Sequence, residues 1–269
     1  HMSAFDDATR LQPTADPGTF TWTVPDGWQQ GRGAWGGLPI GAMVRAVTLT
    51  ESDKSRSVRT VSLQLSAPAM VGQHTVRVSP VRVGKGMSTW LVSVRDAEES
   101  YVCGGTVITG APRAWWTERD DAGWSPVTPP VAPAPETIPV AETPPPFPTF
   151  TQHFAYRVAS GFPLQGSAAE TLGWIDYREA VTPSDVSLIA LTDAWYSVNL
   201  VPLQELIPVA TVNFTANLLV DPATLHTGEP LLHHGLVSGL RDGYTSEQRR
   251  LWTRDGRLAA DTLQTIVVG

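Results

Sequence analysis

One carboxylate of this chain lies in an otherwise apolar stretch. Asp193 falls in the run Ser187-Leu188-Ile189-Ala190-Leu191-Thr192-Asp193-Ala194-Trp195, and the spacing of apolar residues predicts a helix over residues 184–200. A helix that lacks a polar face is normally buried. A buried carboxylate loses its hydration and must find hydrogen-bond donors, raise its pKa or take part in chemistry. Asp193 is therefore either an ordinary buried acid held by its neighbours or a catalytic base.

Two later residues could assist a carboxylate that activates water. Thr211 lies near the start of one strand-like run, and Gln264 lies in the last one. Both side chains donate and accept hydrogen bonds, so they could orient a water molecule for deprotonation. Gly36-Gly37 precede an earlier helical run, where free N–H groups could meet a developing oxyanion. Taken alone, residues of these types more often belong to solvated strand faces and plain loops than to a site.

The composition excludes several classes of protein. Hydrophobic residues make up 42% of the 269 residues and charged ones 17%, which is incompatible with general disorder. The net charge is −7, and no segment carries the basic stripe of a nucleic-acid surface. Cys103 is the single cysteine, so neither an internal disulfide nor a cysteine zinc cluster can form. We expect a protein of the reducing cytoplasm, without a membrane-spanning segment.

Other catalytic motifs are incomplete. The run Gly235-Leu236-Val237-Ser238-Gly239 has the wrong spacing for a nucleophile elbow. Gly84-Lys85-Gly86 lacks the remaining glycines of a phosphate loop. His233 and His234 are neighbours on a predicted strand and point to opposite faces, so they cannot chelate one metal together. The sequence predicts no metal site.

A proline-rich segment divides the chain. Ten prolines fall between Pro126 and Pro148. Such a segment cannot continue a helix or a central strand, and it reads as an extended connector. We therefore predict an N-terminal unit over residues 3–110, a linker over 111–150 that contributes little to the core, and a C-terminal unit over 151–269.

The two units share one pattern. Each opens with strand-like residues, continues with one long helix (37–51 in the first, 184–200 in the second) and ends with four strand-like runs. Those runs are residues 58–67, 74–84, 88–96 and 101–109 in the first unit, and 210–220, 230–240, 245–254 and 258–268 in the second. One helix followed by four strands, twice, predicts an α+β protein in which each unit curls an antiparallel sheet around its own helix.

Several runs resemble the acyl-CoA thioesterase II family, whose members are double-hotdog proteins. They are Ala34-Trp35-Gly36-Gly37-Leu38-Pro39-Ile40-Gly41-Ala42, Ser62-Leu63-Gln64-Leu65-Ser66-Ala67-Pro68, Val81-Arg82-Val83-Gly84-Lys85-Gly86-Met87-Ser88-Thr89, Leu191-Thr192-Asp193, Ala210-Thr211-Val212 and Ala259-Ala260-Asp261-Thr262-Leu263-Gln264. No single motif is specific, but their order and spacing cover both units. The resemblance implies a double hotdog, with two antiparallel sheets that are each wrapped around a long central helix.

The resemblance also assigns roles. In that family a helix Asp, a strand Thr and a last-strand Gln hold the hydrolytic water, and these roles fall here to Asp193, Thr211 and Gln264. Gly36 and Gly37 would supply oxyanion donors from the other unit, so that each chain would have one site built from both units. Trp195 would contact the acyl chain. One departure concerns the acid and histidine that usually follow this Thr, which Asn213 and Phe214 replace.

The predicted function is hydrolysis of fatty acyl-CoA to a free fatty acid and CoA, with acyl-CoA as substrate and no cofactor. A homo-oligomer is possible. Two alternatives stay open: a non-catalytic acyl- or CoA-binding hotdog protein, and a hotdog hydratase or dehydratase. The second alternative usually needs a catalytic His with an Asp, and neither predicted helix contains a histidine.

Overall fold

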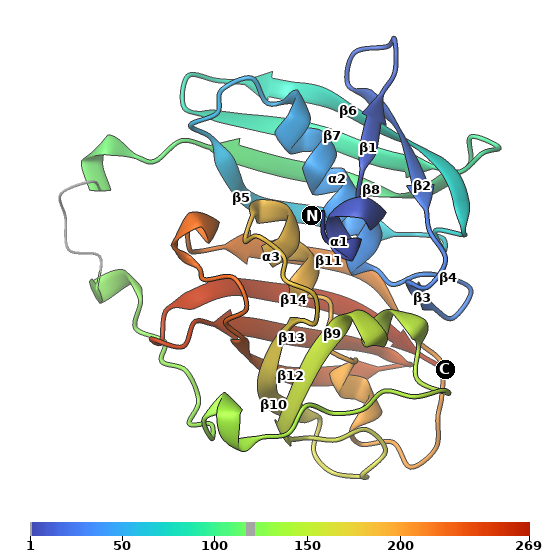
Figure 1. The fold of residues 1–269 in the computed structure, drawn as a ribbon, viewed down its shortest axis with the longest axis vertical. Helices are drawn as coiled ribbons and strands as arrows, with labels where there is room; N and C mark the ends of the chain where they lie inside the picture. The colour runs from blue at the N-terminus through green and yellow to red at the C-terminus, as the bar shows by residue number, and fades with distance from the viewer. Residues whose placement is uncertain (1, 117–121) are drawn as a thin grey trace.

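A computed structural model describes residues 2–116 and 122–269 (Figure 1). The predicted strands are confirmed to within a few residues. The first half contains α1 (Ala4–Ala8), β1 (Leu11–Pro13), β2 (Thr19–Val24), β3 (Gln29–Gln30), β4 (Gly33–Ala34), α2 (Gly37–Thr50), β5 (Ser57–Leu65), β6 (Gly72–Val83), β7 (Met87–Arg95) and β8 (Tyr101–Gly110). The second contains β9 (Phe154–Ser160), β10 (Glu170–Tyr177), α3 (Asp185–Leu191), β11 (Val209–Leu218), β12 (Leu231–Arg241), β13 (Tyr244–Trp252) and β14 (Leu258–Val268). Single-turn 3-10 helices fill several connections, among them η3 (Pro135–Thr137) and η5 (Val198–Leu200).

The expectation of two separate sheets is wrong. Twelve strands form one antiparallel sheet in the order β1-β2-β6-β7-β8-β5-β11-β14-β13-β12-β10-β9. Read from its two ends, the order is the same in both halves, so the internal repeat is confirmed. The halves meet where β5 pairs with β11, from Asn213 opposite Gln64 to Asn217 opposite Thr60. We call this pairing the seam.

The seam follows from the edges that each half would otherwise expose. An isolated β5 or β11 would present a row of unpaired backbone N–H and C=O groups to water. Pairing the two strands satisfies both rows, and the Asn213 side chain adds a 3.3 Å hydrogen bond to the Leu63 carbonyl. The apolar core is likewise continuous across both halves. The two units are therefore built as one packed body.

Helices α2 and α3 contact each other on one face of the sheet (Figure 1). Helix α2 is buried along most of its length and packs on β6, β7 and β8. It starts at Gly37, close to the predicted position, and Gly36 at its N-cap offers no side-chain hydrogen bond. The Leu38 N–H bonds locally to the Trp35 carbonyl at 2.9 Å, and the Gly37 N–H before it is left for a partner from elsewhere in the molecule.

Helix α3 is much shorter than predicted, and Asp193 lies just beyond it rather than in its middle. The N–H groups of Asp193 and Ala194 bond to the carbonyls three residues back, which tightens the end of the helix, and distant side chains bind the carbonyls that follow. The carbonyls bound in this way are those of Asp193 (Trp35 Nε1, 2.8 Å), Ala194 (Tyr156 hydroxyl, 2.7 Å) and Trp195 (Arg249 Nη1, 3.0 Å). The chain instead turns and makes the short helix η5.

The proline-rich segment is extended and packed on the second half, and its apolar residues Ala132, Ile138 and Ala141 are only partly buried where they contact the core. Ala132 and Ile138 pack against a buried cluster of Trp174, Leu232 and Trp252 on the second half. Trp174 Nε1 donates to the Pro133 carbonyl at 2.9 Å, and Arg157 to the Ile138 carbonyl at 2.6 Å. Residues 126–148, named the strap here, are thus docked along the second half. The unit boundaries at 110 and 151 stay a prediction.

No helix in residues 2–116 and 122–269 is long and apolar enough to cross a lipid bilayer.

Candidate active site

Asp193 joins the two halves at the start of α2. Its side chain is 6% exposed, and a Cβ atom added to Gly36 would lie 2.7 Å from Asp193 Oδ2. The backbone N–H of Gly37 stabilises the ionised form of the same carboxylate, which acts to lower its pKa. Trp35 anchors the backbone of Asp193 through the bond from its indole N–H. The carboxylate from the second half is therefore seated on the N-terminus of the helix from the first.

Both glycines at this helix start are required by space. The carboxylate of Asp193 occupies the position where a side chain at Gly36 would begin. At Gly37 an added Cβ would lie 2.0 Å from the Trp35 ring. Residues with side chains would force the carboxylate or the indole away, so the Gly36-Gly37 pair is what allows Asp193 to reach the helix.

Three predicted residues form one hydrogen-bonded chain. Gln264 on β14 donates from Nε2 to Asp193 Oδ1 at 3.2 Å. The Thr211 hydroxyl on β11 donates to Gln264 Oε1 at 3.0 Å. A register shift between β11 and β14 occurs at Thr211/Asn213, so the strand is irregular where it carries Thr211. The structure thus brings together Asp193, Gln264 and Thr211 from three separate elements.

The environment makes Asp193 an unusual acid. Burial raises its pKa from the ordinary 3.8 to about 6, while the Arg249 charge, the Gln264 amide and the Gly37 N–H act in the opposite direction. A carboxylate with a pKa near 6 is ionised at neutral pH and still holds a proton far better than a solvated one. That is the property that a general base needs.

Exposure indicates the side from which a substrate would approach. Gln264 is fully buried and Asp193 nearly so, whereas Thr211 and Gly36 are half-buried. The half-buried Leu65 on β5 lies beside Gly36. Water and substrate would therefore reach the carboxylate at the seam, between the start of α2 and the beginning of β11.

Two charged residues next to the site were missed by the sequence analysis. Arg249 Nη1 lies 3.8 Å from Asp193 Oδ1, and Arg249 Nε lies 2.7 Å from Glu247 Oε1. Both residues are buried on β13. A signal was present in the sequence. Every second position of β13 faces the same side, so the opposite charges of Glu247 and Arg249 share a face with the apolar Leu251.

Trp195, Asn213 and Phe214 lie outside the hydrogen-bonded chain of Asp193, Gln264 and Thr211. Trp195 is 1% exposed, and its ring stacks on His233 with 4.5 Å between the centroids. Its contact with an acyl chain stays a prediction. Asn213 bonds across the seam as described above, and Phe214 is fully buried. These two replacements serve packing and strand pairing in the structure.

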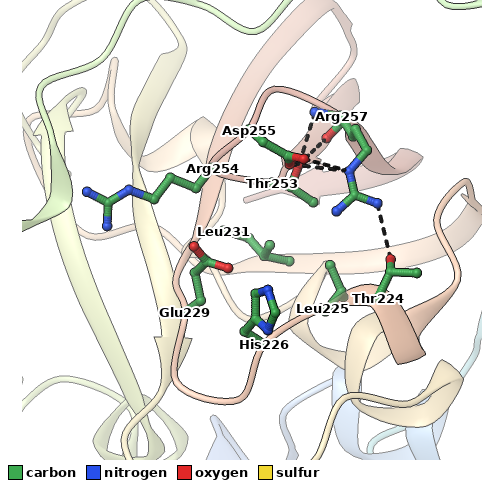
Figure 2. Close-up of a pocket in the computed structure, with 9 residues that line it drawn as sticks. All are labelled: Thr224, Leu225, His226, Glu229, Leu231, Thr253, Arg254, Asp255 and Arg257. Atoms are coloured by element: carbon green, nitrogen blue, oxygen red, sulfur yellow. Dashed lines mark hydrogen bonds and ion pairs between the residues drawn. The ribbon is translucent and has the colours of Figure 1, made fainter.

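A cavity of about 330 Å3 opens elsewhere, beside the turn between β13 and β14 (Figure 2). Figure 2 shows His226 and Glu229 on one side and, on the other, Arg257 bonded to Asp255 and Thr224. Neither Asp193, Thr211 nor Gln264 lines it. It is therefore separate from the candidate site. In the part of the chain that the structure describes, no three His, Cys, Asp or Glu side chains are arranged to hold a metal ion.

Comparison with known proteins identifies the family of the chain. Residues 24–110 match the acyl-CoA thioesterase N-terminal domain, and residues 128–268 match the acyl-CoA thioesterase C-terminal domain. The chain belongs to the acyl-CoA thioesterase family. No match was found among curated protein sequences.

Solved structures share the fold over the full length. A hot dog fold protein of unknown function from Alicyclobacillus acidocaldarius is 24% identical, with a TM-score of 0.88 over 99% of this chain and 98% of that chain. A candidate thioesterase II from Thermobifida fusca is 18% identical, with a TM-score of 0.85 over 100% and 98%. An acyl-CoA thioesterase II from Mycobacterium marinum is 15% identical, with a TM-score of 0.77 over 99% and 98%. The hotdog fold is thereby confirmed, and the family assignment supports thioesterase activity in general terms.

Proposed function

We propose that this protein hydrolyses fatty acyl-CoA to a free fatty acid and CoA, with Asp193 as the general base. The observation that carries the proposal is the bonded chain from Thr211 through Gln264 to a buried carboxylate whose pKa is raised to about 6. A carboxylate with a purely structural role gains from complete pairing, which lowers its pKa. Asp193 instead keeps a strong affinity for a proton.

The residues divide the work in the first step as follows. Asp193 takes a proton from a water molecule while the water oxygen attacks the thioester carbonyl. Gln264 and Thr211 orient that water, since each has donor and acceptor capacity beyond the bonds described. The N–H groups of Gly36 and Gly37 stabilise the oxyanion at the start of α2. Gly37 becomes available for this as Asp193 is neutralised, because a protonated carboxyl accepts a weaker hydrogen bond than a carboxylate does.

The second step restores the base. The tetrahedral oxyanion collapses and the carbon–sulfur bond breaks, with the electron pair leaving on the CoA sulfur. Protonated Asp193 then gives its proton to the thiolate. Water has been split between the acid and the thiol, and the enzyme returns to its starting state without a metal or redox group.

The test is thiol release from a panel of acyl-CoAs of increasing chain length. We expect turnover by the wild type and loss of turnover by Asp193→Ala with an unchanged melting curve. A folded Asp193→Ala variant with near wild-type turnover would contradict the assignment of the base. An exposed acid provides the matched control, since Asp242→Ala should hydrolyse as the wild type does.

The panel also separates the alternatives. A wild-type protein that binds a non-hydrolysable acyl-CoA analogue but releases no thiol from any substrate would be a binding protein. Loss of the enoyl double bond from an enoyl-CoA, without thiol release, would identify a hydratase.

A further inference from the structure

A buried ion pair on β13 holds the turn that carries Asp193. Arg249 is 3% exposed and Glu247 is fully buried, and their side chains are joined at 2.7 Å. Removing two charges from water costs several kcal/mol for each ion, and a pair inside a protein is often no more stable than apolar residues would be. A gain in stability therefore does not explain why charged residues occupy this place. The contacts of the pair with the turn suggest another role.

The pair forms hydrogen bonds with both ends of the turn. Arg249 Nη1 donates to the carbonyls of Trp195 at 3.0 Å and Thr192 at 3.5 Å, on either side of Asp193. Glu247 Oε2 accepts from Ser197 Oγ at 2.9 Å and from Asn199 Nδ2 at 2.9 Å. The backbone N–H of Val198 donates to the same oxygen at 3.2 Å. The turn after α3 is thus fixed to β13 along its length.

Arg249 alone would lower the basicity of Asp193. A guanidinium close to a carboxylate stabilises the ionised form, which makes the carboxylate a weaker acceptor of protons. Glu247 binds the opposite part of the same guanidinium and offsets its charge. In agreement, Arg249 lowers the pKa of Asp193 and Glu247 raises it.

The other groups around Asp193 carry no charge. Helix α2, β11 and β14 present the Gly37 N–H, Thr211 and Gln264. Burial raises the pKa of Tyr156 on β9 and lowers that of His233 on β12, so both are neutral near pH 7. Arg249 and Glu247 are therefore the two charged side chains that act on Asp193 most directly.

We propose that Glu247 is a positioning residue that compensates the charge of Arg249, so that Arg249 can fix the turn of Asp193 without suppressing its basicity. The proposal rests on the proposed function, because it assigns a purpose to the base strength of Asp193. The pair of Arg249 and Glu247 thus sets both the position and the base strength of Asp193, because the two residues have opposite charges.

The two members of the pair predict opposite shifts. Arg249→Met should move the acid limb of the kcat/KM profile upward by about 1 pH unit, because it removes a positive charge beside the base. Glu247→Gln should move the limb downward, by less, and lower the plateau, because the base becomes weaker. Gln keeps one oxygen for Ser197, Val198 and Asn199 but loses the acceptor for Arg249 Nε. The deciding observation is therefore the sign of the two shifts, because a purely structural role gives no reason for shifts of opposite sign.

Arg250→Met is the matched control. Arg250 is adjacent on β13 and lies 3.4 Å from Asp261, so this variant loses the same charge outside the turn, and its limb should stay in place. Arg249→Lys keeps the charge beside Asp193 and should also keep the limb near its wild-type position, which covers the case in which Arg249→Met folds poorly. Shifts of the same sign for Arg249→Met and Glu247→Gln, or no shift in Glu247→Gln, would overturn the proposal.

A measurement without substrate keeps this inference separate from the proposed function. The carboxyl carbon of Asp193 can be titrated by NMR in protein labelled at Asp, with Asp193→Asn to assign the signal. Opposite displacements of its titration in Glu247→Gln and Arg249→Met support the charge compensation, even if no acyl-CoA is hydrolysed. A titration unaffected by Glu247→Gln overturns it, even if hydrolysis is rapid.

Discussion

The two halves each place a carboxylate just after their central helix, and the two carboxylates are treated in opposite ways. Glu51 follows α2 and is 3% exposed. It accepts from the Thr109 hydroxyl at 2.7 Å and the Asp53 N–H at 3.0 Å, and it lies 3.7 Å from Arg56. Burial alone would raise the pKa of Glu51, but these three partners together hold it below its usual value.

Asp193 follows α3 and has a similarly small exposed fraction, 6%, but here burial raises the pKa to about 6. Its donors are a side-chain amide and a backbone amide, and its arginine is shared with Glu247. The balance between burial and partners therefore differs: burial outweighs the partners of Asp193, whereas the partners of Glu51 outweigh its burial. Glu51 is held as a structural carboxylate, and Asp193 keeps a high affinity for a proton.

The largest expected effect is on turnover. Asp193→Asn keeps the shape of the side chain but cannot take a proton, so kcat/KM should fall by about 10^3-fold. Glu51→Gln makes the same chemical change in the other half and should leave kcat/KM within about twofold, because Glu51 has no role in the step. Thiol-release kinetics on both purified variants check the pair. Comparable losses in the two variants would remove the distinction between them.

Stability should respond in the opposite order. Glu51→Ala leaves the buried Arg56 without one of its two carboxylates, and the free energy of unfolding should fall by about 3 kcal/mol. Asp193→Ala removes an acid that is poorly compensated and should cost much less. Chemical denaturation at neutral pH measures both. A smaller loss for Glu51→Ala than for Asp193→Ala would contradict the comparison.

The pH dependence of stability gives a third test. Because the folded protein raises the pKa of Asp193 from 3.8 to about 6, it binds this proton more tightly than the unfolded chain does. The stabilisation is complete below about pH 4 and is lost as pH rises through about 6. The amide side chain introduced by Asp193→Asn does not titrate, so this variant has no such loss of stability. Between about pH 4 and 6 its free energy of unfolding should rise relative to that of the wild type by about 2 to 3 kcal/mol. Unfolding curves between pH 4 and 8 check the sign. A gap that closes as pH rises would show that the pKa is lowered.

The smallest effect is expected at Thr211. Its hydroxyl reaches Asp193 only through Gln264, so Thr211→Val should reduce kcat/KM by about tenfold, the equivalent of one hydrogen bond. Thr215 lies four residues further along β11 and donates to the Leu263 carbonyl at 3.0 Å. Thr215→Val makes the same change away from Asp193 and should have no effect on turnover. Equal effects of the two changes would remove Thr211 from the site.

The strands and the repeat could be predicted because their signals are local. Alternating apolar residues mark β2, β5 to β8 and β10 to β14, and the start of α2 is marked by Gly36-Gly37. The end of α3 is not marked, since residues 184–200 keep a helical pattern throughout. Donors that lie 158, 38 and 54 residues away instead bind the carbonyls of the turn that replaces the rest of the predicted helix. No local sequence pattern indicates hydrogen bonds from such distant residues.

The site was predicted only in part for a similar reason. The family resemblance assigned Asp193, Thr211 and Gln264, which the structure brings together. Arg249 and Glu247 were passed over because charged residues on a strand are usually solvated. The single sheet was missed because the pairing of Gln64 with Asn213 spans about half the chain, and two free edges look alike in sequence whether they meet or not.

The twelve-stranded sheet has two outer edges, at β1 and β9, and both are obstructed. Strand β1 has three residues and ends in Pro13, which has no N–H to offer. On β9 the strap lies alongside, with the Ala141 N–H donating to the Tyr156 carbonyl at 2.7 Å. An open edge is a template on which a second chain can add a strand and begin to aggregate. The strap therefore covers part of one edge of a sheet that the joining of the two halves makes wide, which limits the addition of a further strand there.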